Sequence, residues 1–461
     1  MPAAWDAASE QAARAGLATC DRVLDLVGGR ADALVTRGQG RSALTRFANS
    51  RIHQNMDGDE DHVRLRVVVD GGRIAQATTT RVDDDGLERL VEAAIAAARL
   101  RPADPDFPGL AEPGGPDHFP AVDHFDPATA AATPEQRAAI VADFVATGEG
   151  LEAAGYCSTS SEVHVLRSTS GLRCTSRSTM AQIDAIQRLA QAGGAPADGC
   201  GQTTSVSLGD LDGRGVGEVA AQKARASGDP ISLEPGTYEV VLEPKAVAAM
   251  LLFPAWLGFN GKAHAEGTSF VHLGEAQFDE RIDIWDDATD PRSLGRAYDA
   301  EGTPKRRLDL VSRGVTVGLA HDRRSAALVG VESTGSSIGS EAFGGYPGDL
   351  FLGGGSESAE ELVAGVERGL LVTDFWYNRI LDPKTQVVTG LTRNGLFLIE
   401  RGEVVVPVQN MRYTQSVVGA LGPGHVLGLG GDAQLVSNEG GVVHVPSLRL
   451  GAWAFTGNAK G

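Results

Sequence analysis

The sequence contains little cysteine and no long hydrophobic segment. Its 461 residues include 4 cysteines that form no CxxC pair, Cys20, Cys157, Cys174 and Cys200. A chain of this length does not need disulfide bonds to stabilise its core, so we expect reduced thiols in a cytoplasmic protein. The longest apolar run, 246–259, has 14 residues, contains Pro254 and is too short to span a bilayer. The first residues also lack the basic start of a signal peptide, so we expect neither export nor membrane insertion.

Basic residues are scarce relative to acidic ones. The sequence has 41 Lys and Arg against 60 Asp and Glu, which gives a formal charge of -19. Such a chain repels phosphate backbones, and no segment gathers enough basic residues to reverse this locally. Direct nucleic-acid binding is therefore not expected. The hydrophobic content of 42% and charged content of 22% are typical of globular proteins, and the 59 glycines indicate many turns.

The hydrophobic patterns predict an α+β protein with N-terminal α/β units followed by a mainly β C-terminal domain with a central helix. Seven prolines in 101–127 indicate a connector over the surface, and the predicted units are 1–110, 128–228 and 231–461. The first predicted helix is ended by Gly28 and the second is capped by Asp85. The third spans 134–154, with Thr133 as N-cap and Gln136 at N3, and the fourth spans 244–257. The fifth is capped by Ser358, with Glu361 at N3, and is ended by Gly369. Alternating residues at 62–69 and 73–78 predict a hairpin.

The familiar catalytic motifs are absent. No histidine is followed by glutamate, and the sequence has no GxSxG, Walker or GxGxxG motif. His264, Glu266 and His272 offer possible metal ligands, but their spacing matches no standard zinc set, and a surface position is the favoured interpretation. Gly353-Gly-Gly-Ser is interpreted as a helix entry rather than an anion site. Motifs alone therefore identify no active site.

Four blocks of sequence resemble segments of one family in the same order. They are SALTRFANSRIHQN at 42–55, STSGLR at 168–173, GKAHAEGTSF at 261–270 and GLTRNGLFLIERGE at 390–403. This ordered set resembles the TldD/PmbA family, whose members were once described as modulators of DNA gyrase. The resemblance implies a two-subunit zinc metallopeptidase. In it, the TldD type carries HExxxH on a central helix and a later cysteine ligand, while the TldE (PmbA) type lacks both.

The resemblance places this chain with the second type. Counting back from Gly267-Thr-Ser-Phe, the two histidine positions fall on Leu252 and Leu257, and the glutamate position falls on Phe253. No cysteine follows Cys200, and Pro254 would disturb the helix that presents the ligands. The resemblance therefore implies no metal ligands and no catalytic residues in this chain, with zinc expected in a TldD-like partner.

The leading hypothesis is a cytoplasmic TldE-like subunit that pairs with a TldD-like zinc peptidase and helps bind unfolded or precursor peptides, for instance by strand addition. Arg46, Phe47 and Asn49 are candidates for peptide or partner contact, with a packing role as the alternative. One rival is a self-sufficient peptidase or amidase with a remodelled metal site at His264, Glu266 and His272. Another is a peptide-binding module that forms a homodimer or larger homo-oligomer. Direct action on gyrase or DNA is opposed by the charge.

Overall fold

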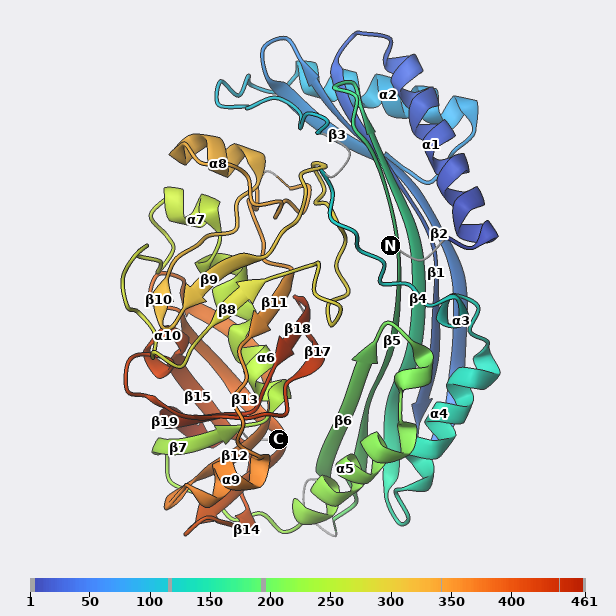
Figure 1. Ribbon diagram of the computed structural model, residues 1–461. Helices are drawn as coiled ribbons and strands as arrows, with labels where there is room; N and C mark the ends of the chain where they lie inside the picture. The colour runs from blue at the N-terminus through green and yellow to red at the C-terminus, as the bar shows by residue number, and fades with distance from the viewer. Residues whose placement is uncertain (1–4, 115–117, 192–195, 341, 439, 459–461) are drawn as a thin grey trace.

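A long curved sheet faces a C-terminal region built on two further sheets (Figure 1). The computed structural model describes residues 5–114, 118–191, 196–340, 342–438 and 440–458. The predicted α+β class is confirmed. Helices cover the convex face of the long sheet, and the C-terminal region lies on its concave side. No helix in the described ranges has the length and apolar character needed to cross a membrane.

The first sheet has six antiparallel strands in the order β3-β2-β1-β4-β5-β6. Their bounds are β1 Asp32–Ala48, β2 Arg51–Val69, β3 Arg73–Thr79, β4 Glu152–Ser168, β5 Arg173–Leu189 and β6 Ala197–Ser205. The predicted hairpin is confirmed as β2 and β3. Strands β1 and β4 pair from Leu34 with Ser168 to Phe47 with Gly155, so the predicted units 1–110 and 128–228 contribute to one sheet.

Alternation along the strands assigns each residue to one face of this sheet. Val35, Val63 and Leu65 are buried with residues of the helices on the convex face. The helices packed there are α1 Ala7–Val27, α2 Asp84–Arg99, α3 Pro127–Ala130, α4 Pro134–Ala146 and α5 Gly213–Ala226. The four cysteines form no disulfide and are buried. Burial raises the pKa of Cys20 to about 12 and that of Cys200 to about 11.

The helix boundaries confirm some predictions and correct others. Gly28 ends α1, as expected, and the structure shows it in a left-handed conformation. The cap of α2 is Asp83 and not Asp85, because the Asp83 carboxylate accepts the Gly86 N–H at 2.7 Å. Helix α4 has the predicted capping box but ends at Ala146 and not 154, because β4 begins at Glu152.

The connector 101–127 was expected on the surface, and its described residues are mostly exposed or half-buried, with Ala111 and His124 as buried exceptions. It runs between the first sheet and the C-terminal region, where Ala111 belongs to a buried cluster with Leu34 and Tyr298. His124 pairs with Ser178 of β5, and its Nδ1 lies 2.9 Å from the Gly295 carbonyl oxygen. Proline disfavours regular structure but does not prevent burial, because these contacts satisfy the chain's polar groups.

The C-terminal region contains two sheets around the largest buried cluster. One sheet has the order β12-β7-β19-β15-β13-β14, with β16 beside β19, and consists of β7 Gly236–Leu242, β12 Arg368–Asp382, β13 Val387–Glu400, β14 Glu403–Pro407, β15 Met411–Ser416, β16 Val426–Leu429 and β19 Leu448–Asn458. The other has the order β10-β9-β8-β11-β18-β17 and consists of β8 Ile284–Asp286, β9 Leu308–Ser312, β10 Val315–Thr316, β11 Asp349–Leu352, β17 Gln434–Asn438 and β18 Gly441–Val445. The helices here are α6 Pro244–Phe253, α7 Gly261–Ala265, α8 Arg323–Val329, α9 Ala359–Ala364 and α10 Val417–Ala420.

Two predicted helices of this region are shorter than expected. Helix α6 ends at Phe253 and not at 257, because Pro254 has no N–H to continue it. A π-helical turn, Pro254–Gly258, follows, in which the Phe259 N–H bonds the Pro254 carbonyl oxygen at 2.8 Å. Helix α9 has the predicted capping box of Ser358 and Glu361 but ends before Gly369, because β12 begins at Arg368.

Candidate functional site

Three cavities follow one another along the concave face of the first sheet. Even-numbered residues of β1 point to this face, and successive cavities are lined by Leu34 and Thr36, by Gly38 to Ser42, and by Arg46. Their volumes are about 470, 360 and 640 Å³. The first two share His62, Glu162 and Ser178, and the third begins two residues further along β5 and four residues further along β1 and β4. We call these three cavities the concave groove; a strand rises about 3.3 Å per residue, so its length along β1 is about 40 Å.

Small side chains line the middle cavity of the concave groove. Gly38, Gly40, Ser42 and Ser160 contribute to it from two neighbouring strands. A Cβ atom on Gly40 would lie 2.4 Å from the Ser161 carbonyl oxygen, so this position requires glycine. The sheet therefore leaves space at the centre of the groove, where larger side chains would fill it.

The third cavity lies between the sheet and helix α6. Lys245, Ala249 and Leu252 line it from one face of α6, since they stand four and three residues apart. The Lys245 Nζ lies 3.0 Å from Asp184 Oδ1 and 3.9 Å from Asp374 Oδ2. Burial raises the pKa of Asp374 to about 6, although the nearby ammonium acts in the opposite direction. This end of the groove therefore has a buried cluster of charges beside hydrocarbon.

Two exposed aromatic rings stand beside the third cavity. Trp376 is 46% exposed and Tyr377 is 62% exposed, at an irregularity in the pairing of β12 with β13. The Arg393 guanidinium carbon lies 4.5 Å from the centre of the Trp376 ring, and that of Arg379 lies 4.4 Å from the Tyr377 ring. Exposed aromatic side chains held in this way are suited to contact with another chain.

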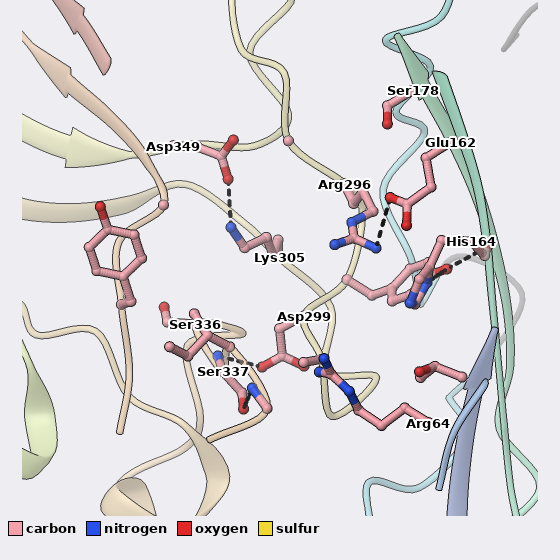
Figure 2. Close-up of a pocket in the computed structure, with 18 of the residues that line it drawn as sticks. Arg64, Glu162, His164, Ser178, Arg296, Asp299, Lys305, Ser336, Ser337 and Asp349 are labelled. Atoms are coloured by element: carbon pink, nitrogen blue, oxygen red, sulfur yellow. Dashed lines mark hydrogen bonds and ion pairs between the residues drawn. The ribbon is translucent and has the colours of Figure 1, made fainter. Parts of the chain in front are cut away.

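The first cavity contains most of the ionisable groups of the concave groove (Figure 2). The Lys305 Nζ lies 2.6 Å from Asp349 Oδ2, and Arg296 lies 3.8 Å from Glu162. Burial, together with Arg296 and other nearby cations, lowers the pKa of His164 well below its ordinary value, so this imidazole is neutral. Burial and the neighbouring Glu301 raise the pKa of Asp299 to about 7.

The structure separates the three predicted contact residues. Arg46 lines the third cavity. Phe47 is 1% exposed and packs against Phe144 on the other face of the sheet, at a ring distance of 5.9 Å. Asn49 lies in the turn between β1 and β2 with a φ of 49°. A role for any of them in peptide or partner contact stays a prediction, and only Arg46 lies on the groove.

The positions linked to a metal site do not form one. Leu252 lines the third cavity, Phe253 is buried, and Leu257 is half-buried in the π-helical turn. Glu266 pairs with Lys262 at 2.7 Å, and His272 is exposed. Across the described part of the chain, no three or more His, Cys, Asp and Glu side chains are arranged to hold a metal ion, His264, Glu266 and His272 included. The donors present do not fit a zinc ion.

No motif in the sequence indicates the first cavity. The alternation His62-Val-Arg-Leu-Arg predicted a strand with one polar face, and this face lines the cavity. That pattern did not indicate what the polar face meets, because Arg296 and Lys305 come from a loop over 200 residues further along the chain.

Comparison with known proteins gives matches along most of the chain. Residues 235–457 match the PmbA/TldA metallopeptidase C-terminal domain, and residues 36–98 match PmbA/TldA metallopeptidase domain 1. A metalloprotease of Methanothermobacter thermautotrophicus is 26% identical over 229 residues, which are 48% of this chain and 48% of that protein. The match thus spans about half the length of that relative.

Two solved structures share the whole fold. A Thermotoga maritima protein, described as a proposed modulator of a DNA gyrase, has a TM-score of 0.84 at 17% identity and covers 95% of this chain and 100% of its own. TldE from Thermococcus kodakarensis has a TM-score of 0.82 at 20% identity, with 98% and 100% covered. At these identities the likeness concerns the fold alone.

Proposed function

Because this chain belongs to the TldD/PmbA family, we propose that it is a non-catalytic TldE-like subunit. It holds extended peptides in the concave groove and leaves their hydrolysis to a TldD-like zinc peptidase partner. Unfolded segments and peptide precursors are the substrate class, because only an extended chain follows a groove about 40 Å long, the length of about 12 residues.

The face of α6 on the concave groove carries this proposal. Zinc-dependent hydrolysis needs about three protein ligands and a base near the metal-bound water. The residues of α6 that line the third cavity are Lys245, Ala249 and Leu252, and the first of these is engaged with Asp184. A hydrocarbon side chain and a paired ammonium supply neither ligand nor base. The groove is retained while its chemical centre is missing, which favours a binding role.

The groove favours recognition by side chains. Strands β1, β4 and β5 have a paired strand on both sides, so over these strands a bound peptide meets the sheet's face. Strand β17, which lines the third cavity through Ser437 and Asn438, is the last strand of its own sheet. Strand addition, the mode expected from the sequence, therefore stays a prediction, with β17 as an edge that lies on the groove. Polar side chains such as Arg46 and Ser160, together with Trp376, offer contacts that suit many peptide sequences.

The decisive experiment measures zinc and peptidase activity of the chain purified alone, and then with a TldD-like peptidase added. We expect near-zero zinc per chain, no cleavage of an unfolded peptide alone, and cleavage that increases when both proteins are present. One zinc per chain with cleavage would instead favour the self-sufficient hydrolase. Peptide binding with no effect on the peptidase would favour the homo-oligomeric binding module.

A blocking variant tests whether peptides use the concave groove. Ser160→Trp places a large ring in the middle cavity, where Ser160 makes no hydrogen bond through its side chain among the described residues. We expect at least tenfold weaker binding of a fluorescent 12-residue unfolded peptide, measured by anisotropy. Ala18→Trp, on the exposed surface of α1, is the matched control and should bind as the parent does. Equal binding by both variants would place the peptide elsewhere.

A further inference from the structure

The charges of the first cavity are not all balanced. The ammonium of Lys305 lies 2.6 Å from Asp349 and 3.9 Å from Asp286, so two carboxylates neutralise it. Arg66 is similarly paired with Glu301 at 2.8 Å. These two pairs are buried. They are part of the wall and do not account for the other cations that line the same cavity.

Arg64 and Arg296 are the cations that remain. Within the described residues Arg64 has no ion pair, and its Nε is buried without a hydrogen-bond partner. Among the residues that the structure describes, the carboxylate nearest to Arg296 is that of Glu162, at 3.8 Å, which is too far for a hydrogen bond. Leaving a guanidinium incompletely paired in a partly buried site costs free energy, unless a bound anion accepts its remaining hydrogen bonds. The chain as a whole is acidic, with a charge of -19.

The surroundings of Arg64 and Arg296 carry charges of both signs and leave a cavity of about 470 Å³. Burial is the main cause that lowers the pKa of His164, and the charges of Arg296 and Arg64 act in the same direction. Figure 2 shows Arg64 from β2 and Arg296 from the loop between β8 and β9 at the same cavity. Two carboxyls also line it: Glu162, at the distance given above, and Asp299, which accepts backbone N–H bonds from Glu301, Thr303 and Ser337 at 2.9 Å each. Because those three bonds hold Asp299, Arg64 keeps its donors for another group.

The concave groove ends beside Arg64. The next row of the sheet consists of Arg66, Leu34 and Ser168, which are paired across the strands and are each at most 7% exposed. Leu34 and Tyr298 pack there with Ala111 of the connector. An extended chain that keeps to β1 therefore meets buried side chains after the first cavity. Toward β3, the first cavity shares Arg66, Gln76 and Gly339 with a further cavity of about 660 Å³. The group that a chain keeping to β1 brings to Arg64 is its end.

We propose that the first cavity binds the C-terminal carboxylate of a peptide that lies in the concave groove, with Arg64 and Arg296 as the binding residues. The inference rests on the proposed function, because it needs a peptide in the groove. Two guanidinium groups offer several N–H donors to one planar anion, a geometry that carboxylates match well. The peptide then lies with its C-terminus between β2 and the loop before β9, and its N-terminal part reaches the third cavity at Arg46.

The test compares three 12-residue unfolded peptides, identical except at the last residue, by fluorescence anisotropy. The first ends in a free carboxylate, the second in a carboxamide, and the third is a carboxamide with Glu at its last position. We expect the free carboxylate to bind at least tenfold more tightly than either carboxamide. Arg64→Gln should reduce this ratio to about one, and Arg296→Gln should reduce it partly. Arg46→Gln, at the other end of the groove, should leave the ratio unchanged.

Each other outcome has a separate meaning. If the peptides bind equally to the parent protein and Arg64→Gln has no effect, the carboxylate pocket is refuted while peptide binding stands. If the Glu carboxamide binds as tightly as the free acid, the pocket recognises a side chain and the terminal assignment is overturned. If no peptide binds, the proposed function itself fails. A melting temperature of Arg64→Gln close to that of the parent ensures that lost binding does not reflect unfolding.

Discussion

The two faces of the first sheet are formed by the same strands but carry side chains of different chemistry. On the convex face, Val35, Val63 and Leu65 are buried against helices. On the concave face, their neighbours Thr36 and Arg64 line a cavity beside the C-terminal region. Since neighbouring residues of a strand point to opposite faces, one segment of β2 contributes to the core and to the groove at once.

This difference between the faces assigns stability mainly to the convex face and binding to the concave face. The convex face removes hydrocarbon from water, which is the main source of folding free energy. The concave face keeps small and polar groups at Gly38, Gly40 and Ser160, which contribute little to a core but leave room for another chain. Substitutions on the two faces should therefore have different effects on stability and on binding.

Leu65→Ala on the convex face should cost the most stability. Leu65 is fully buried among residues of β1, β2 and the helices α1 and α2. Truncation of such a side chain costs about 2–5 kcal/mol, because transfer free energy is lost and a cavity remains. Urea unfolding followed by circular dichroism measures the change. Ser160→Ala on the concave face is the control and should change stability by less than about 0.5 kcal/mol. A similar loss in both variants would contradict the division between the faces.

Asp374, at the α6 end of the concave groove, should make stability depend on pH. Burial raises the pKa of this carboxyl to about 6, so the folded protein holds a proton that the unfolded chain releases near pH 4. Its contribution to stability is present below about pH 4 and is lost as the pH rises through about 6. Two pKa units correspond to about 3 kcal/mol. Relative to Asp374→Asn, the parent should therefore lose about 2–3 kcal/mol between pH 4 and pH 7.

Unfolding free energies of parent and variant across this pH range test the prediction for Asp374. Asp382→Asn supplies a control of opposite sign, because hydrogen bonds from Thr385 and the Lys384 backbone lower the pKa of the exposed Asp382 carboxyl. The contribution of the Asp382 carboxyl to stability is lost as the pH falls through its lowered pKa. If the unfolding free energies of the parent and of Asp374→Asn change with pH in the same way, Lys245 compensates the buried charge of Asp374 completely.

Local signals in the sequence predicted local structure well. The capping boxes at Thr133 and Ser358, the helix end at Gly28 and the break at Pro254 are confirmed, since each depends on groups within a few residues. Helix α5 was not predicted, because glycines at its first positions are unfavourable in a helix and concealed its pattern. Strand β12 was also missed, since the helix before it was expected to continue to Gly369.

The candidate site was beyond local reasoning for a physical reason. Alternation identifies a polar face on β2 but cannot tell a solvated face from one that closes a cavity. That distinction depends on contacts between distant segments, such as β1 with β4 and the connector with Leu34. The family resemblance indicated α6 as the place of interest, and Leu252 does line the groove, but nothing indicated that Arg64 lies at the groove's other end.

Arg64→Leu should have the smallest effect on stability, and its sign is informative. Arg64 and Leu65 are neighbours on β2, so the variant pairs directly with Leu65→Ala. The Nε of Arg64 is buried without a partner, and removal of an incompletely satisfied cation is neutral or stabilising in many proteins. We expect an unfolding free energy within about 1 kcal/mol of the parent or above it, with loss of preference for peptide carboxylates. Urea unfolding without peptide measures it. A decrease of more than about 2 kcal/mol in the unfolding free energy would show instead that Arg64 holds the sheet against the C-terminal region. Both faces of the sheet would then contribute to stability.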